Sequence, residues 1–358
     1  MDVTIGNTRV GDGADPWVIA ELSANHQSSK ALALEIIAAA AESGADAVKF
    51  QHYKPETITV RSAHPDFQIK GGTLWDGKQL ADLYQEAMMP WEWTEDLVAE
   101  CDRRGLTWFS SPFDESAVDF LEQFNPVVYK IASFEMIDLP FVRRVARTNR
   151  PIIMSTGMAS LSEIDAAVTA VRSESDAGLI LLRCNSSYPA NPDEMDLAAI
   201  PEMKRLWGLP VGLSDHTPSA TSAIVAVALG ASVIEKHITL DRADGGPDSQ
   251  FSLEPDEFLH LVKSVKEAKR TIGEVRFGPS AREEASLAFR RSLRIVRPVK
   301  AGDVLSMDNV RSVRPAGGML PDEFAAIVGR RASRDLQVGD PLLRDDVLPS
   351  VAPGPSGA

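Results

Sequence analysis

Short apolar runs alternate with amphipathic stretches along most of the chain. The runs are rich in β-branched and aromatic residues and end in polar residues, which is typical of parallel strands buried on both faces. Between the runs, apolar residues recur at helical spacing, as in residues 30–43. A Ser-x-x-Asp start at Ser162 resembles a capping box and predicts a helix over 162–171. The eight predicted strands are 17–22, 47–51, 107–112, 128–133, 151–157, 179–185, 211–216 and 232–239.

Eight strand–helix units in about 270 residues predict an α/β fold of the (β/α)₈ class, a TIM barrel. The alternative is a doubly wound open sheet that binds a dinucleotide. It is disfavoured because no G-x-G-x-x-G follows the first strand, where Ser23-Ala24-Asn25-His26 stands instead. A long connection over 51–83 follows the second strand. Such a loop either lines or covers a site, or is a surface excursion.

The alternation changes beyond Gly278-Pro279. Residues 300–310 read KAGDVLSMDNV and residues 337–347 read QVGDPLLRDDV, which match at five of eleven positions. The repeat predicts a small, β-rich, pseudo-symmetric module. We therefore expect a catalytic barrel over 1–281, the small domain over 282–348 and a disordered Pro/Gly/Ser/Ala tail over 349–358.

Charge narrows the function classes. With 37 Lys and Arg against 51 Asp and Glu, the net charge is −14, and 44% of residues are hydrophobic. Residues 282–348 carry +2, which leaves −16 for the barrel. Such a chain is a poor binder of nucleic acid or of an anionic membrane.

The absence of targeting segments and the two cysteines indicate the cellular compartment. No apolar run approaches the length of a membrane span, and the N-terminus lacks a signal-peptide pattern. Cys101 and Cys184 give neither a disulfide framework nor a zinc spacing, and no histidine adjoins Cys184 in sequence to support a nucleophile. We expect a cytoplasmic protein.

Polar residues gather where the predicted strands end. In a barrel these positions face the catalytic end, and burying them without partners costs a few kcal/mol each. Their recurrence predicts an active site for a polar substrate. The residues are Glu21, Asn25, Lys49, Gln51, Ser110, Ser111, Lys130, Ser133, Ser155, Thr156, Asn185, Ser186, Ser214, Asp215, His216, Glu235, Lys236 and His237.

Two lysines in this set suggest an anion site. Lys49 and Lys130, with serine hydroxyls on neighbouring strands, suit a phosphate or carboxylate. The alternative is that the lysines form internal ion pairs with Glu21 or Glu235.

Two histidines in the set suggest a metal site. His216 and His237 end neighbouring strands, which lie about 5 Å apart, so both imidazoles could bind one ion. Asp215 and Glu21 are possible neighbours of such a site. With only two convincing protein ligands, several positions would be left for water and substrate oxygen, which favours Mg²⁺ or Mn²⁺. Satisfied core histidines or a general base are the alternatives.

Several motifs resemble the sialic acid synthase family. They are ELSANH from Glu21, ADAVKFQ from Ala45, FSSPFD from Phe109, YKIAS from Tyr129, MSTGM from Met154, GLSDHT from Gly212 and GPD from Gly246. The resemblance runs from about residue 15 to 348, and the C-terminal module resembles the antifreeze-like SAF domain. ELSANH, DGGPDS and FSLEP are most similar to the pseudaminic acid synthase branch. The family usually has a glycine where Ser28 stands in Gln27-Ser28-Ser29.

The resemblance implies a reaction. Family members condense phosphoenolpyruvate with an N-acylated amino sugar to a nine-carbon 2-keto acid and release phosphate by C–O cleavage. For this branch the sugar is 2,4-diacetamido-2,4,6-trideoxy-altrose. The alternatives are an N-acetylneuraminate, legionaminate or other nonulosonate synthase and, more remotely, a catalytically silent sugar-binding protein. The resemblance also implies a homodimer in which each SAF module caps the partner's barrel.

The resemblance assigns roles to individual residues. It implies a divalent Mg²⁺, Mn²⁺ or Co²⁺ ion on His216 and His237, and Glu21 as an acid/base or water-orienting group beside the catalytic Lys49 and Lys130. The implied phosphoenolpyruvate residues are Lys49, Ser110, Lys130, Ser133, Ser155, Asn185 and Ser214. The implied sugar residues are Asn25, Gln51, Tyr188, Asp248, Phe251 and Arg314.

Overall fold

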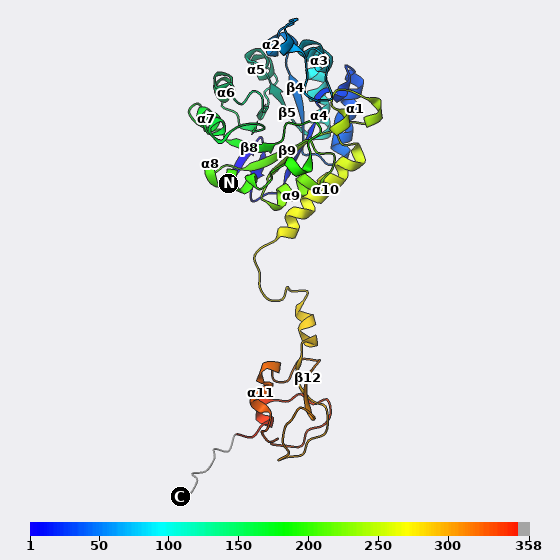
Figure 1. Ribbon diagram of the computed structural model, residues 1–358, viewed down its shortest axis with the longest axis vertical. Coiled ribbons are helices and arrows are strands. Elements are labelled where there is room, and N and C mark those ends of the chain that lie inside the picture. Colours follow the sequence, from blue (N-terminus) through cyan, green and yellow to red (C-terminus); the bar gives the residue numbers. More distant parts are fainter. Residues whose placement is uncertain (350–358) are drawn as a thin grey trace. The chain divides into compact units, whose positions relative to one another are not determined.

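A computed structural model describes residues 1–349 of the chain. The chain divides into two compact units, Met1–Gly273 and a smaller one that begins at Glu274 (Figure 1). The predicted disordered tail lies outside the described residues, except for Pro349. Within the described part, no helix has both the length and the apolar character needed to cross a membrane.

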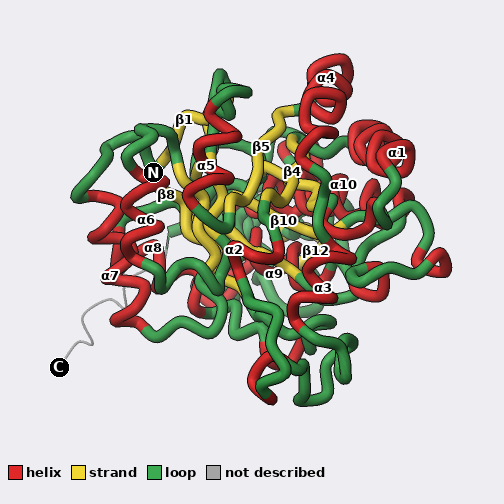
Figure 2. The backbone as a smooth tube through the Cα atoms, turned by 90° about the horizontal axis from the view of Figure 1, so that it is seen from above, coloured by secondary structure: helices red, strands yellow, loops and turns green. Residues whose placement is uncertain are grey.

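Eight parallel strands form a closed barrel in the first unit, which confirms the predicted fold. The strands follow one another around the barrel in chain order, and β10 closes it against β3. Figure 2 shows the strands surrounded by helices. The strands are β3 (Trp17–Glu21), β4 (Ala47–His52), β5 (Thr107–Pro112), β6 (Tyr129–Ile131), β7 (Ile152–Ser155), β8 (Leu179–Cys184), β9 (Val211–Asp215) and β10 (Val233–His237).

Helices connect these strands and pack on their outer face. The α7 helix begins after Ser160, which forms a capping box with Glu163, so the predicted start at Ser162 lies inside the helix. The helices are α1 (Lys30–Glu42), α4 (Thr94–Arg104), α5 (Glu115–Glu122), α6 (Leu139–Ala146), α7 (Leu161–Arg172), α8 (Ala199–Trp207), α9 (Thr221–Ala228) and α10 (Pro255–Ile272).

An antiparallel hairpin closes the N-terminal end of the barrel. Its strands are β1 (Asp2–Ile5) and β2 (Thr8–Gly11). Val3, Ile5 and Val10 pack with apolar strand residues of the barrel in one buried cluster. The polar strand ends therefore lie above an apolar floor. This hairpin was not predicted from the sequence.

The long connection after β4 reaches the carboxyl ends of the strands. It contains α2 (Pro55–Ile58) and α3 (Leu80–Ala87), and between them Trp75 Nε1 donates a hydrogen bond to the carbonyl of Pro247 at 3.0 Å. Trp75 also lies 5.6 Å, centroid to centroid, from the ring of Tyr188. Of the two alternatives, the structure supports a loop that covers the site.

The second unit has its own small core around β11 (Ser292–Ile295), β12 (Val310–Val313) and α11 (Phe324–Ile327). The predicted repeat is visible in its turns. Asp303 accepts from the backbone N–H of Lys300 at 2.8 Å, and the matching Asp340 accepts from that of Gln337 at 2.8 Å. The two repeats therefore form the same kind of turn.

Candidate active site

The alternation of side chains along each strand decides which polar residues face the lumen. Lys49 and Gln51 of β4 point inward, and Gln51 is in register with Ser111 of β5. The Ser111 hydroxyl is buried without a hydrogen-bond partner among the described residues. Ser110, one position earlier, lies on the other face, where its hydroxyl is 2.7 Å from Nδ1 of His52. The prediction of Ser110 as a site residue is therefore wrong by one position, and Ser111 takes its place.

Three other predicted positions also lie away from the lumen. Asp215 and Lys236 form a fully buried ion pair of 2.7 Å on the outer face, so Asp215 is not available to a metal. The Asn185 side chain is held by its own loop, because it donates to the carbonyl of Glu194 and accepts from the N–H of Ser187. These groups support the strands that carry the site.

A buried cluster of four charges occupies the lumen. Lys49 Nζ is 3.0 Å from Glu21 and 3.1 Å from Glu235, and Lys130 Nζ is 3.7 Å from Glu235. Lys130 also donates to the hydroxyl of Ser155 at 2.6 Å. The internal ion pairs considered from the sequence are thus present, and they hold both ammonium groups in place beside hydroxyls.

Burial and the charges of their neighbours shift the pKa values of these four groups in different directions. Burial raises the pKa of Glu21, although Lys49 opposes it. Burial would also raise the pKa of Glu235, but Lys130 and Lys49 outweigh it and lower that pKa to about 2. Burial lowers the pKa of Lys130 to about 8, whereas the two carboxylates raise that of Lys49 despite burial. Lys130 is therefore the ammonium group that gives up its proton more readily.

Hydroxyl groups converge on a glycine beside Lys130. The backbone N–H of Gly157 donates to the Ser133 hydroxyl at 3.0 Å. A Cβ at residue 157 would lie 2.1 Å from the Ser186 hydroxyl and 2.8 Å from that of Ser133, so only glycine fits. Ser133, Ser155 and Ser186 therefore supply short donors next to the lysines, in an arrangement suited to an anion.

The two histidines lie together at the carboxyl ends of β9 and β10, with ring centroids 5.3 Å apart. His216 donates through Nδ1 to the carbonyl of Asn185 at 2.9 Å, so in the neutral ring Nε2 is the nitrogen that would carry the lone pair. Burial lowers the pKa of His237 well below its usual value, and its Nδ1 is buried without a hydrogen-bond partner among the described residues. A neutral imidazole with an unused nitrogen fits a metal ligand.

Aromatic rings enclose the histidine pair. Tyr188 is 4.5 Å from the ring of His216, and Phe251 is 4.9 Å from that of His237. Within residues 1–349, no group of three or more His, Cys, Asp or Glu side chains could hold a metal ion. An ion on this pair would take its remaining ligands from water or substrate.

Polar groups from the first and last loops line the neighbouring rim. Asp248 accepts from the hydroxyl of Ser23, and its Oδ2 is 3.9 Å from Nδ1 of His237. Gln51 donates to Glu21 at 2.9 Å, which orients that carboxylate. Asn25 donates to the carbonyl of Ile238 at 2.7 Å and so ties the loop after β3 to the strand end.

Glu135, in the loop after β6, is a candidate site residue that was not predicted, because nothing in the sequence distinguishes it from other acidic loop residues. Its Oε2 is buried without a hydrogen-bond partner among the described residues, and burial raises its pKa to about 7, which suits proton transfer. Arg314 belongs to the second unit, where it is exposed and bonds to no residue in the described part of the chain.

Ser28, in Gln27-Ser28-Ser29, stands where the family usually has a glycine, and the backbone there is strained. Gln27 and Ser28 both have left-handed backbone conformations, with φ of 46° and 57°. Gln27 donates to the carbonyl of Gly245 at 2.7 Å and so links two loops of the site. The loop keeps the conformation that a glycine would adopt without strain.

We expect Ser28→Gly to raise the free energy of unfolding by about 0.5–1 kcal/mol. Glycine avoids a left-handed penalty of about 1–2 kcal/mol but loses part of that gain to its greater freedom in the unfolded chain. Urea unfolding measures the change. Ser29→Gly is the control: Ser29 has φ −115° and caps α1, so this variant should lose a few tenths of a kcal/mol. Equal effects would contradict the strain.

A closed (β/α)₈ barrel with lysines in its lumen, followed by a separate β-rich module, defines a two-domain barrel protein with a polar site. The chain belongs to the NeuB family, whose profile matches residues 36–277, and a SAF domain matches residues 290–348. The fold and family expected from the sequence are confirmed.

Relatives match the chain over nearly its whole length. It is 41% identical to a pseudaminic acid synthase of Campylobacter jejuni over 92% of this chain and 96% of the relative. An N,N'-diacetyllegionaminic acid synthase of the same species is 34% identical, over 92% of this chain and 98% of the relative. A solved N-acetylneuraminic acid synthetase from Leptospira borgpetersenii, in complex with citrate, has a TM-score of 0.72 and 31% identity, and covers 80% of this chain and 95% of that one.

Proposed function

We propose that this chain is a pseudaminic acid synthase, which condenses phosphoenolpyruvate with 2,4-diacetamido-2,4,6-trideoxy-altrose. The observation that carries the proposal is the pair of buried ammonium groups, Lys49 and Lys130, at the same end of the barrel as His216 and His237. The desolvation of both lysines is already offset by Glu21 and Glu235. An anionic substrate that binds beside these lysines would meet preorganised ammonium groups.

The arrangement accounts for each chemical step. The phosphate and carboxylate of phosphoenolpyruvate would be held by Lys49, Lys130 and the hydroxyls of Ser111, Ser133, Ser155, Ser186 and Ser214. Its C3 attacks the aldehyde carbon of the open-chain sugar, which leaves positive character at C2. Water oriented by Glu21 adds at C2, and the tetrahedral intermediate expels phosphate by C–O cleavage. Glu135, with a pKa of about 7, suits transfer of the protons released.

A divalent ion fits the two histidines. His216 Nε2 and His237 Nδ1 would hold it, since the former is not used by the bond to Asn185 and the latter has no partner among the described residues. When bound, Mg²⁺, Mn²⁺ or Co²⁺ supplies a Lewis acid for the aldehyde oxygen. The rings of Tyr188 and Phe251 restrict the space around this position.

Chelation should abolish turnover without unfolding the protein. Two protein ligands hold an ion weakly, and the barrel core does not depend on it. Phosphate release should stop in a chelator and return with Mg²⁺, Mn²⁺ or Co²⁺, while far-UV circular dichroism stays unchanged. His237→Ala should not be restored by metal, and calorimetry should detect no Mn²⁺ binding to this variant. Full activity of the chelated protein would refute the metal site.

One labelling experiment tests the proposed reaction. The protein is incubated with phosphoenolpyruvate that carries ¹⁸O in the bridging position and with each candidate sugar, and phosphate and keto acid are analysed by mass spectrometry. We expect turnover with the altrose derivative and the label in phosphate. Label retained in the keto acid would indicate P–O cleavage and a different mechanism. No turnover with any sugar would favour a silent binding protein.

The second candidate is the same condensation on a related N-acyl amino sugar. The 34% identity to a legionaminic acid synthase favours it, because the lumen chemistry would serve either sugar. Relative kcat/KM values for the sugars distinguish the two candidates.

We further propose a cytoplasmic homodimer in which each SAF module caps the partner's barrel. The loops after β6 and β7 expose the apolar side chains of Phe134, Ile137 and Met158 at the catalytic end, as expected of a surface that a second copy covers. Arg314 is available to reach a substrate on the partner. Both cysteines are free, as is usual in a reducing compartment.

A further inference from the structure

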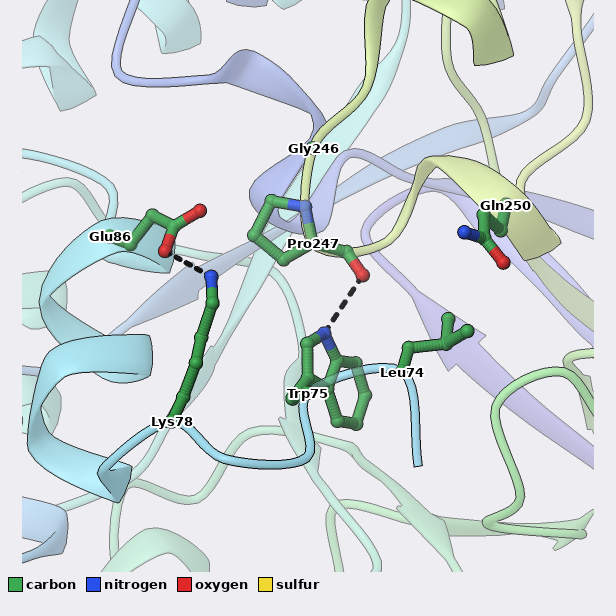
Figure 3. Close-up of a pocket in the computed structure, with 7 residues that line it drawn as sticks. All are labelled: Leu74, Trp75, Lys78, Glu86, Gly246, Pro247 and Gln250. Atoms are coloured by element: carbon green, nitrogen blue, oxygen red, sulfur yellow. Dashed lines mark hydrogen bonds and ion pairs between the residues drawn. The ribbon is translucent and has the colours of Figure 1, made fainter. Parts of the chain in front are cut away.

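A cavity of about 240 Å³ lies between the long connection after β4 and the loop after β10 (Figure 3). We propose that it binds the second acylamino group of the acceptor sugar, the one farther from the aldehyde. This inference rests on the proposed function and deepens it, because it assigns specificity to residues outside the catalytic lumen. The lining residues are Leu74, Trp75, Lys78, Glu86, Gly246, Pro247 and Gln250.

Two contacts link the wall of the cavity to the wall of the site. The indole of Trp75 is 5.6 Å from the ring of Tyr188, which in turn is 4.5 Å from that of His216. On the other side, Pro247 directly precedes Asp248, whose Oδ2 is 3.9 Å from Nδ1 of His237. A sugar with its aldehyde at the histidines would have its remote end on the side of Tyr188 and Trp75, where the cavity lies.

The lining suits a neutral amide with an apolar end. Lys78 and Glu86 pair with each other at 2.5 Å, so neither charge is available to select an ionic group. Trp75 already donates its N–H to Pro247, which leaves its ring face for an acyl methyl group. Gln250 also lines the cavity, and its amide offers both a donor and an acceptor.

The volume of the cavity determines how large an acyl group it can hold. An apolar cavity of about 150 Å³ is enough for a benzene molecule. This cavity therefore admits acyl groups larger than acetyl. We expect the wild-type protein to accept a sugar with a propionyl group at the remote amine with a KM within about threefold of that for acetyl.

The test is the ratio of kcat/KM for two acceptors, one diacylamino sugar and one with a hydroxyl in place of the remote acylamino group. Leu74→Trp fills the cavity and should lower this ratio by about ten- to hundredfold, with the KM for phosphoenolpyruvate changed by less than about twofold. Leu206→Trp on α8 is the matched control, because Leu206 is 42% exposed and Leu74 is 38% exposed. This control should leave the ratio unchanged.

A second variant tests whether the Gln250 amide recognises the acylamino group, without filling the cavity. Gln250→Leu removes the amide at nearly constant volume and should lower the same ratio about tenfold, again without a change in the KM for phosphoenolpyruvate. If the wild type turns over both sugars and neither variant changes the ratio, the cavity assignment is refuted and the proposed function stands. If the wild type turns over no acylamino sugar with phosphoenolpyruvate, both fail.

Discussion

Lys49→Met should lower kcat/KM for phosphoenolpyruvate by about a thousandfold and the free energy of unfolding by about 3–5 kcal/mol. The loss of activity follows from removing a preorganised charge that would bind the anionic substrate. The loss of stability follows because Glu21 and Glu235, 3.0 and 3.1 Å from the ammonium, stay buried without it. Activity per folded molecule and urea unfolding together measure both effects.

Lys236→Met is the matched control. Lys236 pairs with Asp215 at 2.7 Å, and both side chains are fully buried, but the pair lies on the outer face of the barrel. This variant should lose a similar 3–5 kcal/mol of stability while the folded fraction keeps kcat/KM within about threefold. An equal loss of activity per folded molecule in both variants would mean that Lys49 acts only through stability.

Mixing two inactive variants should restore activity if the dimer is as proposed. His237→Ala and Arg314→Ala should each be nearly inactive, because a complete site would need His237 from one chain and Arg314 from the other. After subunit exchange at equal amounts, half the dimers are mixed and each has one intact site. Activity should then recover to about a quarter of the wild-type value.

As a control, the formation of mixed dimers is measured by native mass spectrometry, with one of the two variants isotopically labelled. If mixed dimers form and activity does not recover, or if Arg314→Ala alone is fully active, the proposal that the SAF module serves the partner's site fails. A mixture of His237→Ala with Lys49→Met should stay inactive, because both residues belong to the same barrel.

The sequence predicted the barrel well because its periodicity is a direct result of burial. All eight predicted strands exist, since strands covered on both faces need continuous apolar runs. The hairpin of β1 and β2 was missed because each strand has only four residues and half of each is exposed. Short, half-exposed strands leave too few positions for an alternation to stand out.

The site was predicted less completely than the fold. The sequence predicted where each strand ends, but not whether a given side chain points into or out of the barrel. Ser111 points inward and its neighbour Ser110 points outward, so an error of one position changes the assignment. Glu135 and Trp75 gain their significance from burial and from contacts across the fold, such as the bond between Trp75 and Pro247. No local pattern contains that information.

The hairpin at the barrel floor offers a practical handle. Its packing against the N-terminal ends of the strands keeps Met1 exposed at the end opposite the histidines, where the Met1 amino group lies 3.3 Å from Asp12. A tether attached at residue 1 would therefore hold the protein on a solid support with the catalytic mouth facing the liquid. Immobilised in this way, the barrel could be supplied with sugars in continuous flow.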